Sequence, residues 1–118
     1  AVLDWEMATL GDPLTDVALL AAYQGVSLLA GGDVVSDVAR APGYPSVEDL
    51  LSRYAHGSGR DLSSLAFHLG LAHFKLAVIL EGIHYRYEHG QTIGEGFAAI
   101  GDVIGPLVRA GLQALEED

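Results

Sequence analysis

The sequence predicts a mainly α-helical protein, a bundle of about four helices with one short β-strand stub at its N-terminal end. Half of the 118 residues are hydrophobic, which is enough for a packed core and argues against disorder. Apolar side chains recur every three or four residues over long stretches, which is the spacing of a helix face. Glycine, proline and aspartate interrupt these stretches where helices are expected to end or begin. The fold class follows from these three observations.

Residues 1–3 are apolar and are expected to form the end of a buried β-strand. A single strand leaves its N–H and C=O groups without partners, at a cost of roughly 1–3 kcal/mol for each buried group. We therefore expect the strand to pair with a second copy of the chain or with a part of the protein outside it. The chain starts inside this strand and without an initiator methionine. We expect it to be one domain, residues 1–118, of a longer protein.

An Asp-Pro pair marks the start of the first helix. Asp12 is expected to cap the helix, and Pro13 stands at the first helical position, where its missing N–H costs nothing. The helix should run to about residue 30 and stop at Gly31-Gly32. Residues 31–45 have turn chemistry and little periodicity, so they are expected to form a loop.

Two further helices follow. A capping-box pattern over residues 46–49 predicts a short helix that ends near Ala55, before a breaker at residues 56–61. The third helix is the longest and ends at His89-Gly90. It is apolar on two faces, so we expect it to be central and covered by other helices on more than one side. One stripe comprises Leu62, Leu65, Leu69, Leu76, Leu80, Ile83 and Tyr87, and the other comprises Phe67, Leu71, Phe74 and Val78.

The last helix is expected to start at a second capping box, at Thr92 and Glu95. Pro106 should kink it. Gly101 and Gly105 lie four residues apart on one face of this helix. We expect them to let another helix approach closely.

Charge and composition exclude several classes of partner. Sixteen acidic residues against six basic ones give a net charge of −10. Nucleic acid is excluded as a partner because phosphate backbones are bound by clustered lysine and arginine, and an anionic membrane surface is disfavoured for the same reason. We identify no membrane span and no signal peptide. The chain has no cysteine, which excludes disulfides and thiolate metal sites and fits a cytoplasmic location.

Two blocks of sequence resemble a known family. The block VLDWEMATLGDPLTDVA, residues 2–18, resembles the metal-binding segment of the aminoglycoside phosphotransferase and choline kinase-like family, which has the protein-kinase-like fold. The block FKLAVILEGIHYRYEHGQTIGEGF, residues 74–97, resembles the C-terminal helices of one branch of that family. In that branch such domains stand alone in bacteria or are fused to acyl-CoA dehydrogenases. The two blocks together span most of the chain.

The resemblance implies roles for several acidic residues. Asp4 matches the aspartate that binds the magnesium ion bridging the phosphates of ATP. Magnesium takes hard oxygen ligands and few of them from the protein, which is why a carboxylate stands there. Glu6 is left open between a second ligand and a solvated side chain. Asp16 matches an acid that accepts hydrogen bonds from the catalytic-loop backbone and so supports it, whereas Asp12 remains a helix cap.

Two residues of the third helix are candidates for substrate binding. Glu81 stands in a strongly apolar stretch, and Tyr85 lies towards the far end of the same helix. The alternative for Glu81 is a place on a solvated strip, and for Tyr85 a place on a surface helix end. The branch implies hydroxyacyl-CoA or another small hydroxyl compound as the phosphate acceptor.

Several motifs of the family are missing from the chain. The nucleotide-binding glycine loop, the strand lysine and the HGD-x-x-x-x-N catalytic loop all precede the metal segment in the family, and none occurs here. We therefore expect the C-terminal, substrate-binding part of a phosphotransferase, without its N-terminal lobe and inactive alone. ATP and magnesium would serve the intact protein only. The alternative is a non-catalytic helical module or pseudo-kinase that self-associates through the strand stub or an exposed apolar face.

Overall fold

The computed structural model describes residues 1–30 and 37–116. These residues form four α-helices and no strand: α1 (Leu14–Ala30), α2 (Val47–Ser58), α3 (Leu65–Glu88) and α4 (Ile100–Glu116). Short 3₁₀ turns occur at Trp5–Met7 and Asp37–Arg40. The mainly helical fold class is therefore confirmed. The stop expected at Gly31-Gly32 lies outside the described residues.

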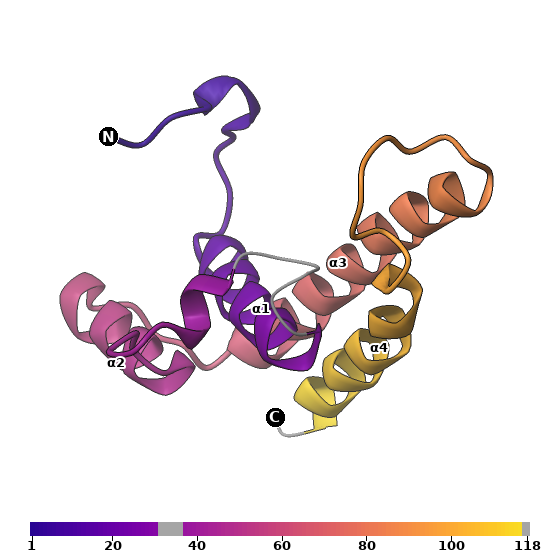
Figure 1. Ribbon diagram of the computed structural model, residues 1–118. Helices are drawn as coiled ribbons and strands as arrows, with labels where there is room; N and C mark the ends of the chain where they lie inside the picture. Colours follow the sequence, from indigo (N-terminus) through magenta and orange to yellow (C-terminus); the bar gives the residue numbers. More distant parts are fainter. Residues whose placement is uncertain (31–36, 117–118) are drawn as a thin grey trace.

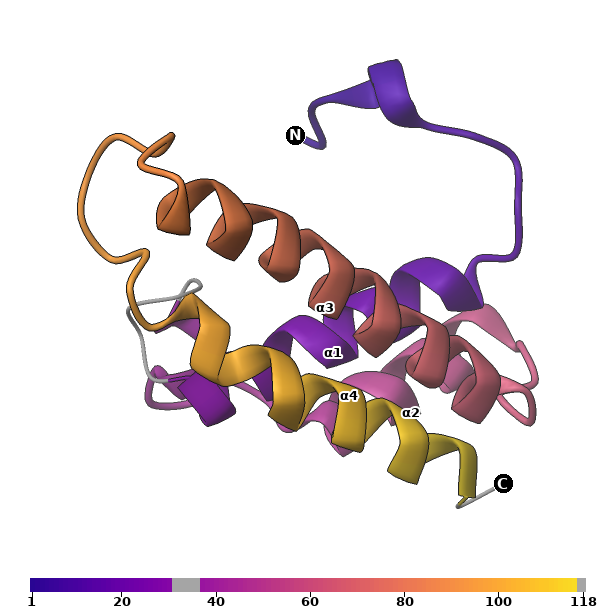
Figure 2. The ribbon, with the colours of Figure 1, turned by 90° about the vertical axis from the view of Figure 1, so that its right-hand side faces the viewer.

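The core lies where α3 meets α1 on one side and α4 on another. Figures 1 and 2 show α4 running alongside α3, Figure 2 shows α1 crossing behind them, and Figure 1 shows α2 at the edge of the molecule. Small side chains dominate the contact of α3 with α1, which lets the two helix axes come close. The buried core comprises Ala18, Ala22 and Val26 of α1, Ala72, Leu76, Ala77 and Leu80 of α3, and Ile100, Val103 and Leu107 of α4.

The central position of α3 is confirmed, but its second apolar stripe is not covered. Phe67 and Phe74 are 61% and 63% exposed, and Leu71 and Val78 also lie at the surface. The expectation that other helices cover both faces is therefore wrong for the described residues. α3 is also long and apolar enough, by length and composition alone, to cross a membrane. Core helices of soluble helical bundles can have the same length and composition.

The predicted starts of α1 and α2 are confirmed. Asp12 Oδ1 accepts a hydrogen bond from the Leu14 N–H at 2.9 Å, which is the geometry of a helix cap. Ser46 and Asp49 form the reciprocal capping box of α2. α3 begins at Leu65, after the first residue of its apolar stripe, Leu62, because Asp61 accepts hydrogen bonds from the N–H and the hydroxyl of Ser63 and holds a turn there. The same hydroxyl lowers the pKa of Asp61.

α4 begins eight residues after the predicted capping box at Thr92, at Ile100. Gly94 and Gly96 have φ values of 113° and 93°, and this backbone conformation cannot continue a right-handed helix. α4 then runs through Pro106 as one helix.

The N-terminal strand is also absent. Residues 1–3 have no regular structure, and the chain turns at Trp5–Met7. The physical reason is that a strand needs a partner to receive its hydrogen bonds, and no described segment supplies one.

Close approach of α4 to α3 depends on glycines, one of which was predicted. A Cβ at Gly101 would lie 2.8 Å from the His84 ring, and a Cβ at Gly70 would lie 2.8 Å from Leu115. A Cβ at Gly111 would lie 3.0 Å from the Cβ of His73 and 3.4 Å from the Gly70 carbonyl oxygen. Gly105, by contrast, faces only Arg109 of its own helix, so the prediction for this residue is wrong.

We predict that Gly111→Ala lowers the free energy of unfolding relative to Gly105→Ala. Both changes gain about 1 kcal/mol of helix propensity, but only the first forces two packed backbones apart, at about 1–3 kcal/mol. Urea unfolding followed by far-ultraviolet circular dichroism measures the difference. Equal stability of the two variants would contradict the close contact at Gly111.

Candidate functional site

The first thirteen residues form an arm that leaves the helical body (Figures 1 and 2). The arm is held in a turn by the Trp5 Nε1–H, which donates to the Val2 carbonyl at 2.9 Å, and by the Ala8 N–H, which donates to the Trp5 carbonyl at 3.0 Å. Its large apolar side chains are exposed: Trp5 is 68% and Leu10 fully exposed. The arm therefore has a defined local fold and almost no packing against the body.

Asp4 is the one described residue other than glycine with a positive φ. Its φ of 61° and ψ of 49° lie in the left-handed region, which aspartate tolerates better than most residues. The Asp4 side chain is exposed, and Glu6 two residues later is exposed as well. The turn thus presents two acidic side chains to solvent. Left-handed backbone positions at residues other than glycine are common at functional sites.

A cavity of about 540 Å³ lies between the arm and the helical body. The arm supplies one wall, Thr15 and Asp16 in the first turn of α1 supply another, and Lys75 of α3 closes it. Asp16 is exposed, and its carboxylate accepts no hydrogen bond from the described residues. The cavity therefore combines an unpaired carboxylate and an amine on a rigid part of the fold.

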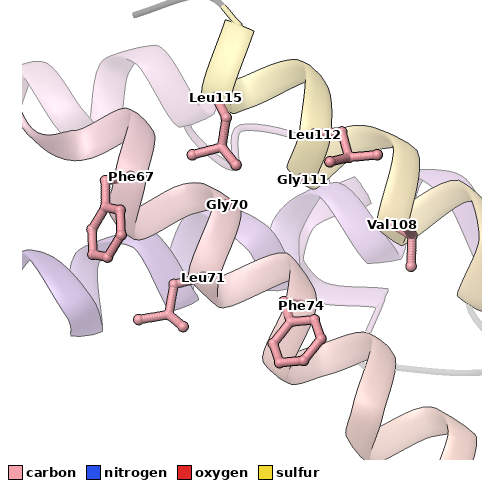
Figure 3. Close-up of a pocket in the computed structure, with 8 residues that line it drawn as sticks. All are labelled: Phe67, Gly70, Leu71, Phe74, Val108, Gly111, Leu112 and Leu115. Atoms are coloured by element: carbon pink, nitrogen blue, oxygen red, sulfur yellow. The ribbon is translucent and has the colours of Figure 1, made fainter.

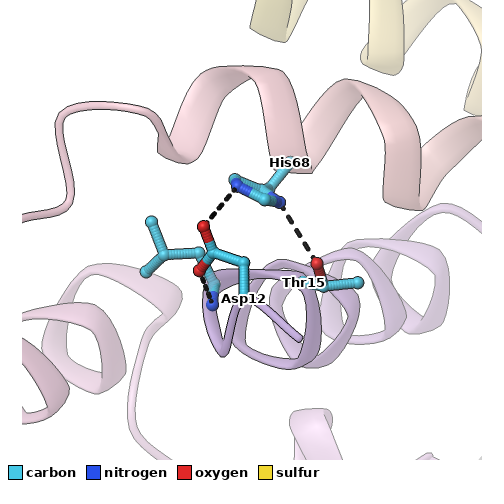
Figure 4. A network of polar contacts seen from close by, with 4 residues as sticks. Asp12, Thr15 and His68 are labelled. Carbon is cyan, nitrogen blue, oxygen red and sulfur yellow. Dashed lines mark hydrogen bonds and ion pairs between the residues drawn. The ribbon is translucent and has the colours of Figure 1, made fainter. Parts of the chain in front are cut away.

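A polar contact fixes the base of the arm to the body (Figure 4). His68 of α3 lies between Asp12 and Thr15, with its Nε2 3.5 Å from the Asp12 carboxylate and its Nδ1 3.3 Å from the Thr15 hydroxyl. Asp12 thus caps α1 and contacts α3 at the same time. This contact was not predictable from the sequence, because Thr15 and His68 are 53 residues apart and no local pattern links them.

The described residues do not assemble a magnesium site by themselves. They contain no group of three histidine, cysteine, aspartate or glutamate side chains placed to hold a metal ion. Asp4 has the right donor chemistry, because magnesium takes one or two carboxylates together with phosphate oxygens and water. A lone exposed carboxylate lacks those other ligands. The site is therefore incomplete without further groups.

The two residues expected to bind substrate lie elsewhere. Glu81 is exposed on α3, and Tyr85 is 58% exposed with its ring stacked on His89 at a centroid distance of 4.0 Å. Neither lines the cavity beside the arm. Lys75 does line this cavity, and only the cavity assigns it to the site.

The fold and the site together define a helical module with an acidic N-terminal arm. The large apolar side chains of this arm are not covered by the described residues. The chain is 36% identical over 119 residues to "Acyl-CoA dehydrogenase family member 11" of Mus musculus, across 96% of this chain and 15% of that protein. It is 38% identical over 96 residues to "Acyl-CoA dehydrogenase family member 10" of Mus musculus, across 78% of this chain and 9% of that protein.

A plant relative extends the comparison. "Probable acyl-CoA dehydrogenase IBR3" of Arabidopsis thaliana is 27% identical over 118 residues, across 94% of this chain and 14% of that protein. The homologues are thus acyl-CoA dehydrogenase family members, and this chain spans about 15% of the length of those first matched. No protein-family model matches the chain. No solved structure matches it either.

We predict that Asp12→Ala destabilises the chain by about 0.5–2 kcal/mol, because the helix cap is lost. Asp12→Asn keeps an oxygen acceptor for the Leu14 N–H and removes only the charge that faces His68. It should therefore retain most of the stability. Urea unfolding of both variants measures the two contributions, and an equal loss in Asp12→Asn would mean that the contact with His68 outweighs the cap.

Proposed function

We propose that this chain is the C-terminal, substrate-binding part of an ATP- and magnesium-dependent phosphotransferase that acts on a hydroxyl group of a small molecule. The observation that carries the proposal is the backbone of Asp4. The aspartate that the family resemblance assigns to magnesium is also the one described residue other than glycine in the left-handed region. Left-handed positions at residues other than glycine cluster at active sites and ligand clamps.

The chemistry of Asp4 fits the proposed role. Phosphoryl transfer depends mainly on positioning and on neutralising the charge of the phosphates. Bound magnesium would supply that neutralisation, and Asp4 would hold it through one carboxylate, with Glu6 as a possible second ligand or a solvated neighbour. The exposed turn leaves the Asp4 side chain free to meet a nucleotide held by another part of the protein.

The names of the relatives support the branch of the family. The branch suggested by residues 74–97 includes domains fused to acyl-CoA dehydrogenases, and the relatives are acyl-CoA dehydrogenase family members. We therefore propose a hydroxyacyl compound, or another small hydroxyl compound, as the acceptor. Glu81 and Tyr85 are proposed to contact the acceptor from α3, and a cytoplasmic location is part of the same proposal.

Asp16 is proposed to support the catalytic loop of the intact protein. Its carboxylate is unpaired among the described residues and lines the 540 Å³ cavity beside the arm, so it is available to accept hydrogen bonds from a segment that enters there. The 118-residue chain lacks that loop, the nucleotide glycine loop and the strand lysine. It is therefore proposed to be inactive alone.

A second candidate function is a non-catalytic helical module. The exposed apolar side chains of the arm, Trp5 and Leu10 among them, favour it, because such side chains normally have a partner. A longer protein that contains this segment but binds no ATP would support this second candidate over the first.

We predict that Asp4→Ala, made in a longer protein that contains this segment, reduces ATP-dependent phosphoryl transfer by more than about 10²-fold, because a fixed charge contact at the phosphates is lost. The exposed turn should let the variant keep the far-ultraviolet circular dichroism spectrum of the wild type. Glu48→Gln, an exposed carboxylate on α2, is the matched control and should keep full activity. Undiminished phosphorylation by Asp4→Ala would remove Asp4 from the reaction.

A further inference from the structure

An apolar face shared by α3 and α4 is open to solvent. Figure 3 shows apolar side chains following one another along α3 and others on the adjacent turns of α4. We call this the α3–α4 face and define it by Phe67, Leu71, Phe74, Val108, Leu112 and Leu115. These side chains are between 38% and 63% exposed. Together with Gly70 and Gly111 they line a groove of about 320 Å³ that contains no polar side chain.

The spacing on both helices is that of a helix-packing seam. Phe67, Leu71, Phe74 and Val78 are separated by alternating steps of four and three residues, and the steps on α4 from Val108 to Leu115 follow the same rule. Such alternation places apolar side chains along a line that faces a partner helix. The α3 stripe therefore forms a ridge of side chains. The groove beside it can accept such a ridge from another helix.

The floor of the groove is shaped by glycines. Gly70 and Gly111 are buried between the helices, and the absence of a Cβ at Gly70 leaves the space that Leu115 occupies. The backbones of α3 and α4 consequently lie close together there, and the side chains on either side rise above them. A helix laid into the groove would contact Phe74 from one side and Leu112 from the other.

The size of the face suits an interface between proteins. The exposed fractions of its six side chains correspond to on the order of 500 Å² of apolar surface, if a whole aromatic side chain offers about 200 Å². That is near the upper end of the largest patch on an ordinary monomer, about 300–600 Å². A standard interface buries about 800 Å² per partner, of which roughly 56–65% is apolar, so this face offers about the apolar area that such an interface needs.

We propose that a second copy of this chain covers the α3–α4 face, with α3 of each copy lying antiparallel in the groove of the other about a two-fold axis near Leu71. A two-fold interface must be self-complementary, and this face presents both the ridge and the groove that the other copy needs. No charged residue belongs to the face, although the chain carries a net charge of −10. The inference does not depend on the phosphotransferase proposal.

The charge of the chain gives the association a signature. Two copies of charge −10 repel each other at long range, and salt screens that repulsion over about 10 Å at 0.1 M. Contact between apolar faces is not weakened by salt in this way. The dimer should therefore become tighter as sodium chloride is raised, whereas an association through ion pairs would become weaker.

Sedimentation velocity of the 118-residue chain over a range of concentrations tests the proposal, with circular dichroism as the check on folding. The wild type should pass from monomer to dimer and no further. Phe74→Glu and Leu112→Glu should raise the dissociation constant by on the order of 10²-fold, because each would bury an unpaired charge against apolar side chains of the other copy. Val38→Glu, which adds the same charge at a 56% exposed position outside the face, and Leu10→Glu on the arm should leave it unchanged.

Cross-linking tests the position of the axis. The chain has no cysteine, so Leu71→Cys introduces a single thiol near the proposed axis, and Val38→Cys is its control. A short bis-maleimide should join two copies of the first variant and not of the second. A wild-type chain that stays monomeric, loss of the dimer only in Leu10→Glu, open-ended aggregation, or binding of the monomer to phospholipid vesicles would each overturn the proposal.

Discussion

The structure depends on the packing of α3 between α1 and α4. Small residues make this possible: alanines at the contact with α1, and glycines at the contact with α4. Close contacts of this kind leave little room for adjustment, because protein interiors are packed to near crystal density. The positions of the arm, the cavity and the α3–α4 face all follow from this one arrangement, since each is built partly from α3.

The base of the arm is attached to two helices of the body. Asp12 caps α1 and contacts His68 of α3, so the residue at which the arm meets the body is bound to both helices. Beyond it, the arm makes few contacts and exposes its apolar side chains. The acidic turn is thus attached to the body at Asp12 and exposed beyond it, an arrangement suited to contact with a second structural unit.

Much of the fold was predictable, because helix periodicity and capping are local. The cap at Asp12, the capping box at Ser46 and the core stripe of α3 were all readable from neighbouring residues. The errors arose where the sequence pattern was ambiguous or the outcome depended on distant partners. Glycines at 94 and 96 outweighed the capping signal at Thr92, and residues 1–3 needed a strand partner. For the site, the type of residue at Asp4 and Asp16 was predictable, but the cavity that joins Asp16 to Lys75 was not, because it is formed by segments far apart in the chain.

Trp5 is the sole tryptophan of the chain, and it lies in the arm rather than in the core. Its indole is hydrogen bonded to Val2 and 68% exposed. Tryptophan fluorescence excited at the red edge of the protein absorption band therefore reports the surroundings of the arm. It should change little when the helices unfold. A blue shift of that emission would signal that something has come to rest on the acidic turn, which makes the native chain its own optical probe of docking at this end of the molecule.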